Sequence, residues 1–223
     1  MTFNVNFNNN ATKISQDIAK LPARADIIMF QEVKWVTVAD YLPAADWYVY
    51  QVTNSGDARR GSAVAVRRSI MSGLYGAGLH LGVAAGDADM LDRYIAWVEI
   101  ALTNGQRIRV MSLHMPPQRY VELQTPMANS LAGLVNSIEY PVVVGGDWNF
   151  TVNNDPRGIT QKTRLLRTGI GIDGFYYERK AVSVSSTNRL SGLNVNSDHD
   201  PVQIITQVYN LTPVSAVGDW AIY

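Results

Sequence analysis

The sequence predicts an α+β fold in which two packed, mostly antiparallel β-sheets are flanked by helices, giving a four-layer sandwich. Segments with strand periodicity outnumber those with helical periodicity, and hairpin signals join several of them. The clearest hairpin signal is Asn104-Gly105 between two apolar segments, because Asn-Gly suits the tight turn that joins antiparallel strands. The few helices are then left to cover the outer faces of the sheets.

Ten segments are expected to be strands, because each alternates or is continuously apolar between turn-forming residues. They are residues 2–6, 26–31, 47–53, 62–67, 93–102, 107–113, 141–145, 172–177, 180–185 and 201–208. The segment 141–145 (Pro-Val-Val-Val-Gly) is apolar almost throughout, which is typical of a strand buried on both faces.

Two segments carry apolar residues at three- and four-residue spacing, the pattern of an amphipathic helix. In the first, Asn10 or Thr12 would cap the start and Pro22 would end the helix. The second, residues 121–138, is the longest helical pattern in the chain. We expect these helices to pack their apolar faces against the sheets.

The length of 223 residues suits one domain, which we place at residues 1–209, with residues 210–223 as a C-terminal tail or edge element. The formal net charge is zero, which argues against a protein that grips nucleic acid along its whole surface. A local basic strip is still compatible with this charge. Because the chain has no cysteine, any metal must be held by oxygen or imidazole, which favours magnesium, manganese or calcium over structural zinc.

No apolar segment is long enough to span a bilayer, so no membrane span is expected. The N-terminus lacks the basic stretch followed by an apolar one that marks a signal peptide. We therefore expect a cytoplasmic protein, or a secreted one if a leader has been removed. A monomer is the default expectation.

Acids, amides and histidines recur where the expected strands end, which is where α/β folds place their sites. The six clusters are Asn4-Val5-Asn6, Gln31-Glu32, Leu113-His114, Gly146-Asp147-Trp148-Asn149, Ile172-Asp173-Gly174 and Ser197-Asp198-His199. Each alone has a plain structural explanation, because Asp and Asn are common in turns and helix caps. Their order along the chain is far more specific, and two of the three histidines fall within them. The third, His80, is expected to be an ordinary strand residue.

In this order the six clusters resemble the endonuclease/exonuclease/phosphatase superfamily, over residues 3 to about 202. Deoxyribonuclease I, exonuclease III, sphingomyelinases and inositol-polyphosphate phosphatases share the pattern. The segments 146–149 and 197–199 carry most of its specificity. His114 resembles the histidine-containing branch of deoxyribonuclease I, sphingomyelinases and phosphatases, since the exonuclease III branch lacks it. The resemblance implies a deoxyribonuclease I-like fold.

The resemblance also implies a divalent metal, expected to be Mg²⁺, with Mn²⁺ or Ca²⁺ able to substitute or assist. Glu32 would be its principal ligand, Asn6 would assist through water, and Asp198 would add a metal or water contact. An amide at position 6, where a carboxylate is also found in the family, would weaken metal affinity, so the number of ions stays open. His114 would act as a general acid or as a phosphate contact.

Water attack on a phosphodiester needs a group that aligns the water and positive charge on the phosphate oxygens. By resemblance, Asp147 would position or deprotonate the water, and Asn4 would fix the direction of Asp147. Asn149 would bond a phosphate oxygen. His199 would contact the phosphate as an imidazolium, held and kept protonated by Asp173.

The substrate is less clearly indicated than the chemistry. Arg60 and Arg119 could track a phosphate backbone, although arginines at strand ends are as often solvated surface. Trp35, Tyr41 or Trp148 could stack on a base, although aromatics beside strands are more often core, and Trp148 has the better claim because it lies within the catalytic segment 146–149. The chain is short for the superfamily, so we expect an open cleft, which suits a polymer.

We therefore expect a magnesium-dependent DNA endonuclease with little sequence preference, and nucleic acid as its partner. A phosphomonoesterase or a lipid phosphodiesterase on the same catalytic residues is the first alternative. The second alternative, from another class, is a catalytically silent module that binds nucleic acid or protein.

Overall fold

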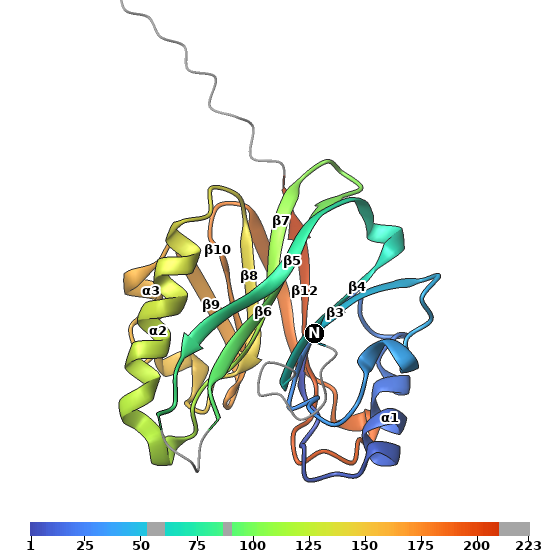
Figure 1. The fold of residues 1–223 in the computed structure, drawn as a ribbon. Helices are drawn as coiled ribbons and strands as arrows, with labels where there is room; N and C mark the ends of the chain where they lie inside the picture. Colours follow the sequence, from blue (N-terminus) through green and yellow to red (C-terminus); the bar gives the residue numbers. More distant parts are fainter. Residues whose placement is uncertain (53–60, 87–90, 210–223) are drawn as a thin grey trace, which may run out of the picture.

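Two six-stranded sheets face each other, with helices on their outer faces (Figure 1). The computed structural model describes residues 1–52, 61–86 and 91–209. One sheet, called sheet A, consists of β1 (Thr2–Asn4), β2 (Ile27–Gln31), β3 (Trp47–Gln51), β4 (Ser62–Arg67), β11 (Val182–Arg189) and β12 (Val202–Val208). The other, called sheet B, consists of β5 (Met71–Val83), β6 (Arg93–Leu102), β7 (Arg107–His114), β8 (Val142–Asp147), β9 (Leu165–Ile170) and β10 (Asp173–Glu178).

The strand order is β11-β12-β1-β2-β4-β3 in sheet A and β5-β6-β7-β8-β10-β9 in sheet B. Only the pairs β1–β2 and β7–β8 are parallel, and the other paired strands of both sheets are antiparallel. Short 3-10 helices lie at Val38–Tyr41, Arg68–Ile70, Gln118–Tyr120, Val152–Asn154 and Ser191–Leu193.

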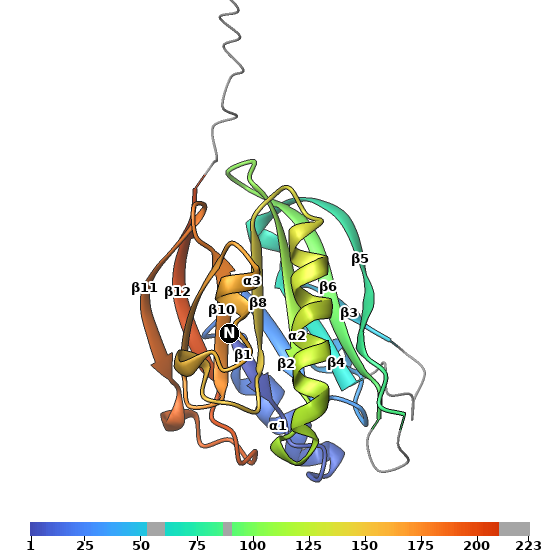
Figure 2. The same cartoon turned by 90° about the vertical axis from the view of Figure 1, so that its left-hand side faces the viewer.

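Helix α1 (Ala11–Lys20) covers sheet A, while α2 (Val121–Asn136) and the short α3 (Ile159–Lys162) cover sheet B (Figure 1). The side chain of Asn10 accepts a hydrogen bond from the Lys13 amide at 3.0 Å, so Asn10 is the N-cap of α1. Helix α2 runs lengthwise along the strands of sheet B (Figure 2). Pro22 lies two residues beyond the end of α1, consistent with its expected role as a stop signal.

Apolar side chains fill three layers of core. One cluster lies between α1 and sheet A, a second between the two sheets, and a third between sheet B and α2. Burial on both sides of each sheet is the main favourable term for such a fold. The arrangement confirms the predicted four-layer sandwich. Within the described ranges, no helix is both long and apolar enough to cross a membrane.

Two strands, β5 and β9, were not among the ten expected segments, although His80, which lies in β5, was expected to be a strand residue. Strand β5 holds four glycines, which weaken strand periodicity, yet at Gly78 only a glycine fits because an added Cβ would come 2.7 Å from the ring of Trp97. Strand β9 contains Arg167, Thr168 and Gly169, which hide its apolar pattern. Residues 210–223, expected to be a tail or an edge element, lie outside the described residues.

The topology gathers the polar strand ends at one edge. The parallel pairs place Asn4 beside Gln31 in sheet A and His114 beside Asp147 in sheet B. Strand β10 runs antiparallel to β8, so its first residue, Asp173, pairs with Asp147 at the same edge.

Gly146 gives a test of how tightly β7 and β8 are joined at this edge. A Cβ at position 146 would overlap the backbone carbonyl of Leu113, whereas Gly133 on α2 has no neighbour within 4 Å of an added Cβ. We predict that Gly146→Ala lowers the free energy of unfolding by roughly 1–3 kcal/mol. The matched control Gly133→Ala should raise it by up to about 1 kcal/mol, because Ala is the better helix former. Urea unfolding of both variants measures this, and equal midpoints would contradict it.

Candidate active site

A cavity of about 410 Å³ opens at the edge where the polar strand ends meet. Nine of the predicted site residues line it: Asn4, Asn6, Glu32, His114, Arg119, Asp147, Asn149, Asp198 and His199. They come from both sheets and from segments up to 195 residues apart, from Asn4 to His199. The sequence clusters therefore converge in space as expected.

Asn4 connects the two sheets through Asp147. Its Nδ2 donates to Asp147 Oδ2 at 2.9 Å, and its Oδ1 accepts from the Asn6 amide at 2.9 Å. Both side chains of the Asn4–Asp147 pair are buried. The amide of Asn4 is thus fixed in orientation and holds the carboxylate in one direction, as the resemblance implied.

Asp147 is a buried carboxylate with an altered proton affinity. Burial and the nearby charge of Asp173 raise the pKa of Asp147 to about 6, although His199 and the hydrogen bonds from Asn149 and Asn4 act in the opposite direction. A carboxylate with this pKa is mostly ionised at pH 7 and is basic enough to take a proton from water during attack.

His199 and Asp173 form the second pair. His199 Nδ1 donates to Asp173 Oδ2 at 2.8 Å, and its Nε2 lies 3.8 Å from Asp147 Oδ2. Burial alone would lower the pKa of His199, but the hydrogen bond and charge of Asp173, with the charges of Asp147 and Asp198, raise it to about 9. His199 is therefore an imidazolium at neutral pH, with Asp173 behind it.

His114 has the opposite charge state to His199. Burial and the positive charges of Arg93 and His199 hold the pKa of His114 well below its usual value, so the ring is neutral. Its Nδ1 lies 3.1 Å from Arg93 Nη1, which can only donate, so the proton of the neutral ring is on Nε2. Nε2 lies 3.5 Å from Asp147 Oδ2 and 3.7 Å from Glu32 Oε1. Of the two roles left open by the resemblance, this geometry favours a hydrogen-bond donor over a charged acid.

Sequence reasoning missed Arg93, which lines the cavity. Its Nε is buried and makes no hydrogen bond with the described part of the chain. Arg93 is the first residue of β6, the hairpin partner of β7, and its side chain reaches His114 at the end of β7. The available signal was a basic residue at the start of a strand whose neighbour ends in a histidine.

Three residues at the cavity have positive φ angles: Asn6 (58°), Glu32 (63°) and Asn149 (51°). Such backbone conformations cost on the order of 1–3 kcal/mol each for residues other than glycine and gather at functional sites. Hydrogen bonds hold these turns in place. Glu32 Oε2 accepts from the Phe7 amide at 2.8 Å, and the Asn149 amide donates to Asp147 Oδ1 at 2.9 Å.

The loop that carries His199 is anchored from α1. Asp17 is fully buried, and its carboxylate accepts hydrogen bonds from the Asn196 amide, from Asn196 Nδ2 and from Lys20 Nζ. Ser197 Oγ donates to the Asn4 carbonyl at 2.7 Å and accepts from the His199 amide at 3.1 Å. Asp17 was also missed, because a lone acid in a helix carries no sequence signal of a long-range contact.

One predicted substrate contact, Trp148, does not reach the cavity. The prediction that Trp148 stacks on a base is wrong, because the ring is 0% exposed, lies 4.4 Å from the ring of Tyr176 and donates from Nε1 to the Gly174 carbonyl. It is a core residue that holds the turn after β8. Arg60 lies outside the described residues. Asn149 lines the cavity, and its Nδ2 donates to the Met115 carbonyl at 2.8 Å.

Two sets of residues offer ligands for a divalent cation. Among the described residues, Asp147, Asp173 and His199 have ligand atoms within 4.8 Å of one another. The protonated state of His199 opposes metal binding there, since an imidazole must be neutral to ligate.

The second set consists of Glu32, Asp198 and Asn6, and it offers oxygen donors that suit a hard cation. Asn6 Nδ2 donates to Asp198 Oδ1 at 2.8 Å, which keeps these two side chains together, and Glu32 lines the same cavity. These residues fit a magnesium-type ion better than the first set does.

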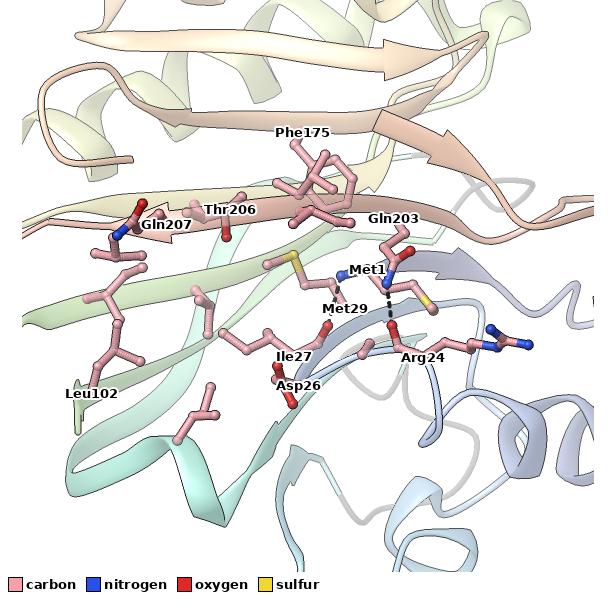
Figure 3. A pocket seen from close by; sticks show the side chains of 18 of the residues that line it. Met1, Arg24, Asp26, Ile27, Met29, Leu102, Phe175, Gln203, Thr206 and Gln207 are labelled. Atoms are coloured by element: carbon pink, nitrogen blue, oxygen red, sulfur yellow. Dashed lines mark hydrogen bonds between the residues drawn. The ribbon is translucent and has the colours of Figure 1, made fainter. Parts of the chain in front are cut away.

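A cavity of about 470 Å³, larger than the one that holds these residues, lies elsewhere. It extends between the sheets toward the opposite strand ends, beside Leu102 and β12 (Figure 3). The Met1 amine donates to the Ile27 carbonyl at 2.8 Å, and Gln203 donates to the Arg24 carbonyl. Among the described residues, the lining of this cavity has no cluster of acids and histidines, so volume alone does not identify the active site.

Solved structures share this fold at low sequence identity. A humanized TDP2 from D. rerio superposes with a TM-score of 0.72 at 13% identity, over 93% of this chain and 97% of that one. A mannosyl-6-phosphatase from Bacteroides thetaiotaomicron gives 0.71 at 15% identity, over 92% and 98%. The human Nocturnin catalytic domain gives 0.59 at 14% identity, over 86% and 87%. No curated protein sequence matches the chain.

The sequence itself matches the Endonuclease/Exonuclease/phosphatase family over residues 1–199, which spans all six polar clusters. Members of this family are phosphoesterase hydrolases, and they generally use a divalent metal. The resemblance drawn from the order of the clusters is thereby confirmed, and the chain belongs to the Endonuclease/Exonuclease/phosphatase family.

Proposed function

We propose that the chain is a Mg²⁺-dependent phosphodiesterase that cuts DNA with little sequence preference. The observation that carries the proposal is the pairing of a buried, ionised Asp147 with the imidazolium of His199 in one cavity. Opposed pKa shifts in neighbouring groups are the usual sign of a base and an electrophilic partner.

In this mechanism Asp147, directed by Asn4, accepts a proton from the attacking water as the new P–O bond forms. The imidazolium of His199 stabilises the charge that develops on the phosphate and gives a proton to the leaving oxygen. Arg93 and the Nε2–H of His114 face the same cavity and donate to phosphate oxygens.

A divalent cation held by Glu32, with Asn6 and Asp198, would supply further positive charge for the phosphate oxygens. The choice of DNA is supported by the cations Arg93 and Arg119 at the cavity, which suit a polyanion. A second D. rerio TDP2 structure that shares this fold is complexed with a single-stranded DNA product.

A phosphomonoesterase is the second candidate, favoured by the similarity of fold to the mannosyl-6-phosphatase. Phosphomonoesters need the same water, base and positive charge, so the cavity does not distinguish the two. Relative rates on the two kinds of substrate decide between them.

The first test is nicking of supercoiled plasmid with Mg²⁺. We expect the wild-type protein to nick, and Asp147→Asn to be slower by roughly 10²–10⁴-fold, as for loss of a general base. Release of phosphate from sugar phosphates is measured in parallel. Absence of nicking by folded wild-type protein at high concentration would remove the proposal, and faster phosphate release would select the monoesterase.

The second test concerns the cation. Glu32→Gln removes a carboxylate charge from the expected ligand set, so the Mg²⁺ concentration for half-maximal rate should rise on the order of 10–100-fold. Excess Mg²⁺ or Mn²⁺ should restore part of the rate. Glu139→Gln, an exposed site just beyond α2, is the control and should not change the Mg²⁺ requirement. An unchanged requirement in Glu32→Gln would rule out Glu32 as a ligand.

The third prediction concerns pH. His199 has a raised pKa, so its charge is present at neutral pH and is lost as pH rises through about 9, whereas Asp147 becomes ionised as pH rises through about 6. We expect kcat/KM to rise as pH passes about 6, where Asp147 ionises, and to fall as pH passes about 9, where His199 loses its charge. Asp173→Asn removes the main group that raises the His199 pKa, so the fall should move toward the ordinary value of about 6.5.

Imidazole NMR titration measures the same shift without activity. The exposed Asp40→Asn variant is the control and should keep the wild-type pKa of His199. An unmoved His199 pKa in Asp173→Asn would show that Asp173 does not set its charge.

A further inference from the structure

We propose that a second, smaller cavity beside the active site binds the base of the nucleotide next to the reacting phosphate. The cavity has a volume of about 210 Å³. It shares six lining residues with the catalytic cavity: Phe7, Glu32, Arg93, His114, Pro117 and Arg119. The inference rests on the proposed action on phosphodiesters, and it adds which part of the substrate this chain grips.

The smaller cavity is lined by exposed apolar side chains. Trp35 is 53% exposed, Leu91 49% and Phe7 47%, although side chains of this size are normally covered. Tyr94 and Tyr120 add two partly buried rings to the same lining. A contiguous group of exposed apolar residues next to charged ones marks a ligand site rather than ordinary surface.

Cations lie against these rings. Lys34 Nζ is 4.9 Å from the centre of the Trp35 ring, and Arg119 Cζ is 5.1 Å from that of Tyr120. Arg93 and Arg119 line both cavities and offer positive charge on the side that adjoins the catalytic cavity, where Glu32 also lies, while Lys34 and Asp92 line the smaller cavity alone. Flat apolar walls beside cations suit a group that is aromatic and attached to a phosphate, as a nucleobase is.

The size of the cavity limits its occupant to one ring system. Pockets for drug-sized ligands run to roughly 300–1,000 Å³, which is larger than this cavity. Every base has a flat π-face, so stacking on an aromatic ring holds any of the four. The cavity would therefore give grip on a nucleotide without strong sequence preference.

Binding of small phosphate esters tests the proposal without catalysis. The probes are 2′-deoxyadenosine 5′-monophosphate, deoxyribose 5-phosphate and inorganic phosphate, each titrated with Mg²⁺ by calorimetry. Loss of one stacked base is worth roughly 5–150-fold in affinity, so the nucleotide should bind tighter than the sugar phosphate by a factor in that range. Trp35→Ala should abolish this advantage and leave the affinity for deoxyribose 5-phosphate unchanged.

The matched control is Tyr75→Ala, which removes a 61% exposed ring on β5 outside both cavities and should keep the wild-type preference. If Trp35→Ala does not fold, Trp35→Phe is used in its place, because phenylalanine keeps a stacking ring. Nucleotide should then quench the tryptophan emission of wild-type protein, and this quenching should be lost in Trp35→Phe.

Equal affinity of wild-type protein for the nucleotide and the sugar phosphate would overturn the inference, even if the protein nicks plasmid. A preference for the nucleotide that survives Trp35→Ala would also overturn it. A base-dependent affinity lost in Trp35→Ala supports it, and absence of nicking in the same preparation would count against the proposed reaction alone.

Discussion

The active site depends on a set of buried polar contacts that join the two sheets at one edge. Asn4 in sheet A bonds Asp147 in sheet B, and Gln31 Nε2 donates to Ser112 Oγ at 2.9 Å. Ser112 Oγ donates in turn to the Phe30 carbonyl at 2.6 Å. Apolar contacts between the sheets favour closeness but have no direction, whereas these bonds fix how the sheets meet. Each member is buried, so a shifted sheet would leave a donor or acceptor unpaired at a cost of roughly 1–3 kcal/mol.

The same burial gives the site its chemistry. Taking Asp147 out of water raises its pKa, and the charge of His199 with the hydrogen bonds from Asn149 and Asn4 acts against that rise. His199 is charged because Asp173 compensates for its burial. Burial and the positive charges of Arg93 and His199 lower the pKa of His114, so its ring stays neutral. Asp147 Oδ2 lies 3.5 Å from His114 Nε2 and 3.8 Å from His199 Nε2, and burial together with the surrounding charges gives these three groups different protonation states.

The sequence alone predicted which polar residues lie at strand ends, but it did not predict most of the contacts that these residues make. Clusters such as Asp147 and His199 stand next to apolar segments whose periodicity is strong, so their place at a sheet edge could be inferred. Trp148 was assigned to substrate because it lies between two polar site residues, but the turn after β8 directs its ring into the core. Arg93 and Asp17 act through partners 21 and 179 residues away. Local pattern carries no information about such contacts unless strand pairing is known first.

The position of the aromatic residues suggests how one set of catalytic groups can be combined with different substrates. Phe7 directly follows Asn6, Trp35 comes three residues after Glu32, and Tyr120 comes six after His114. Asp147 and His114 lie at strand ends, where sheet hydrogen bonds and the contacts between sheets leave little freedom, and the loop of His199 is anchored by hydrogen bonds to α1 and β1. The aromatic residues lie just beyond the strands in connecting segments, which tolerate change without loss of the core. Substrate preference can therefore vary in these segments while the sheets and the anchoring hydrogen bonds keep the catalytic groups in place.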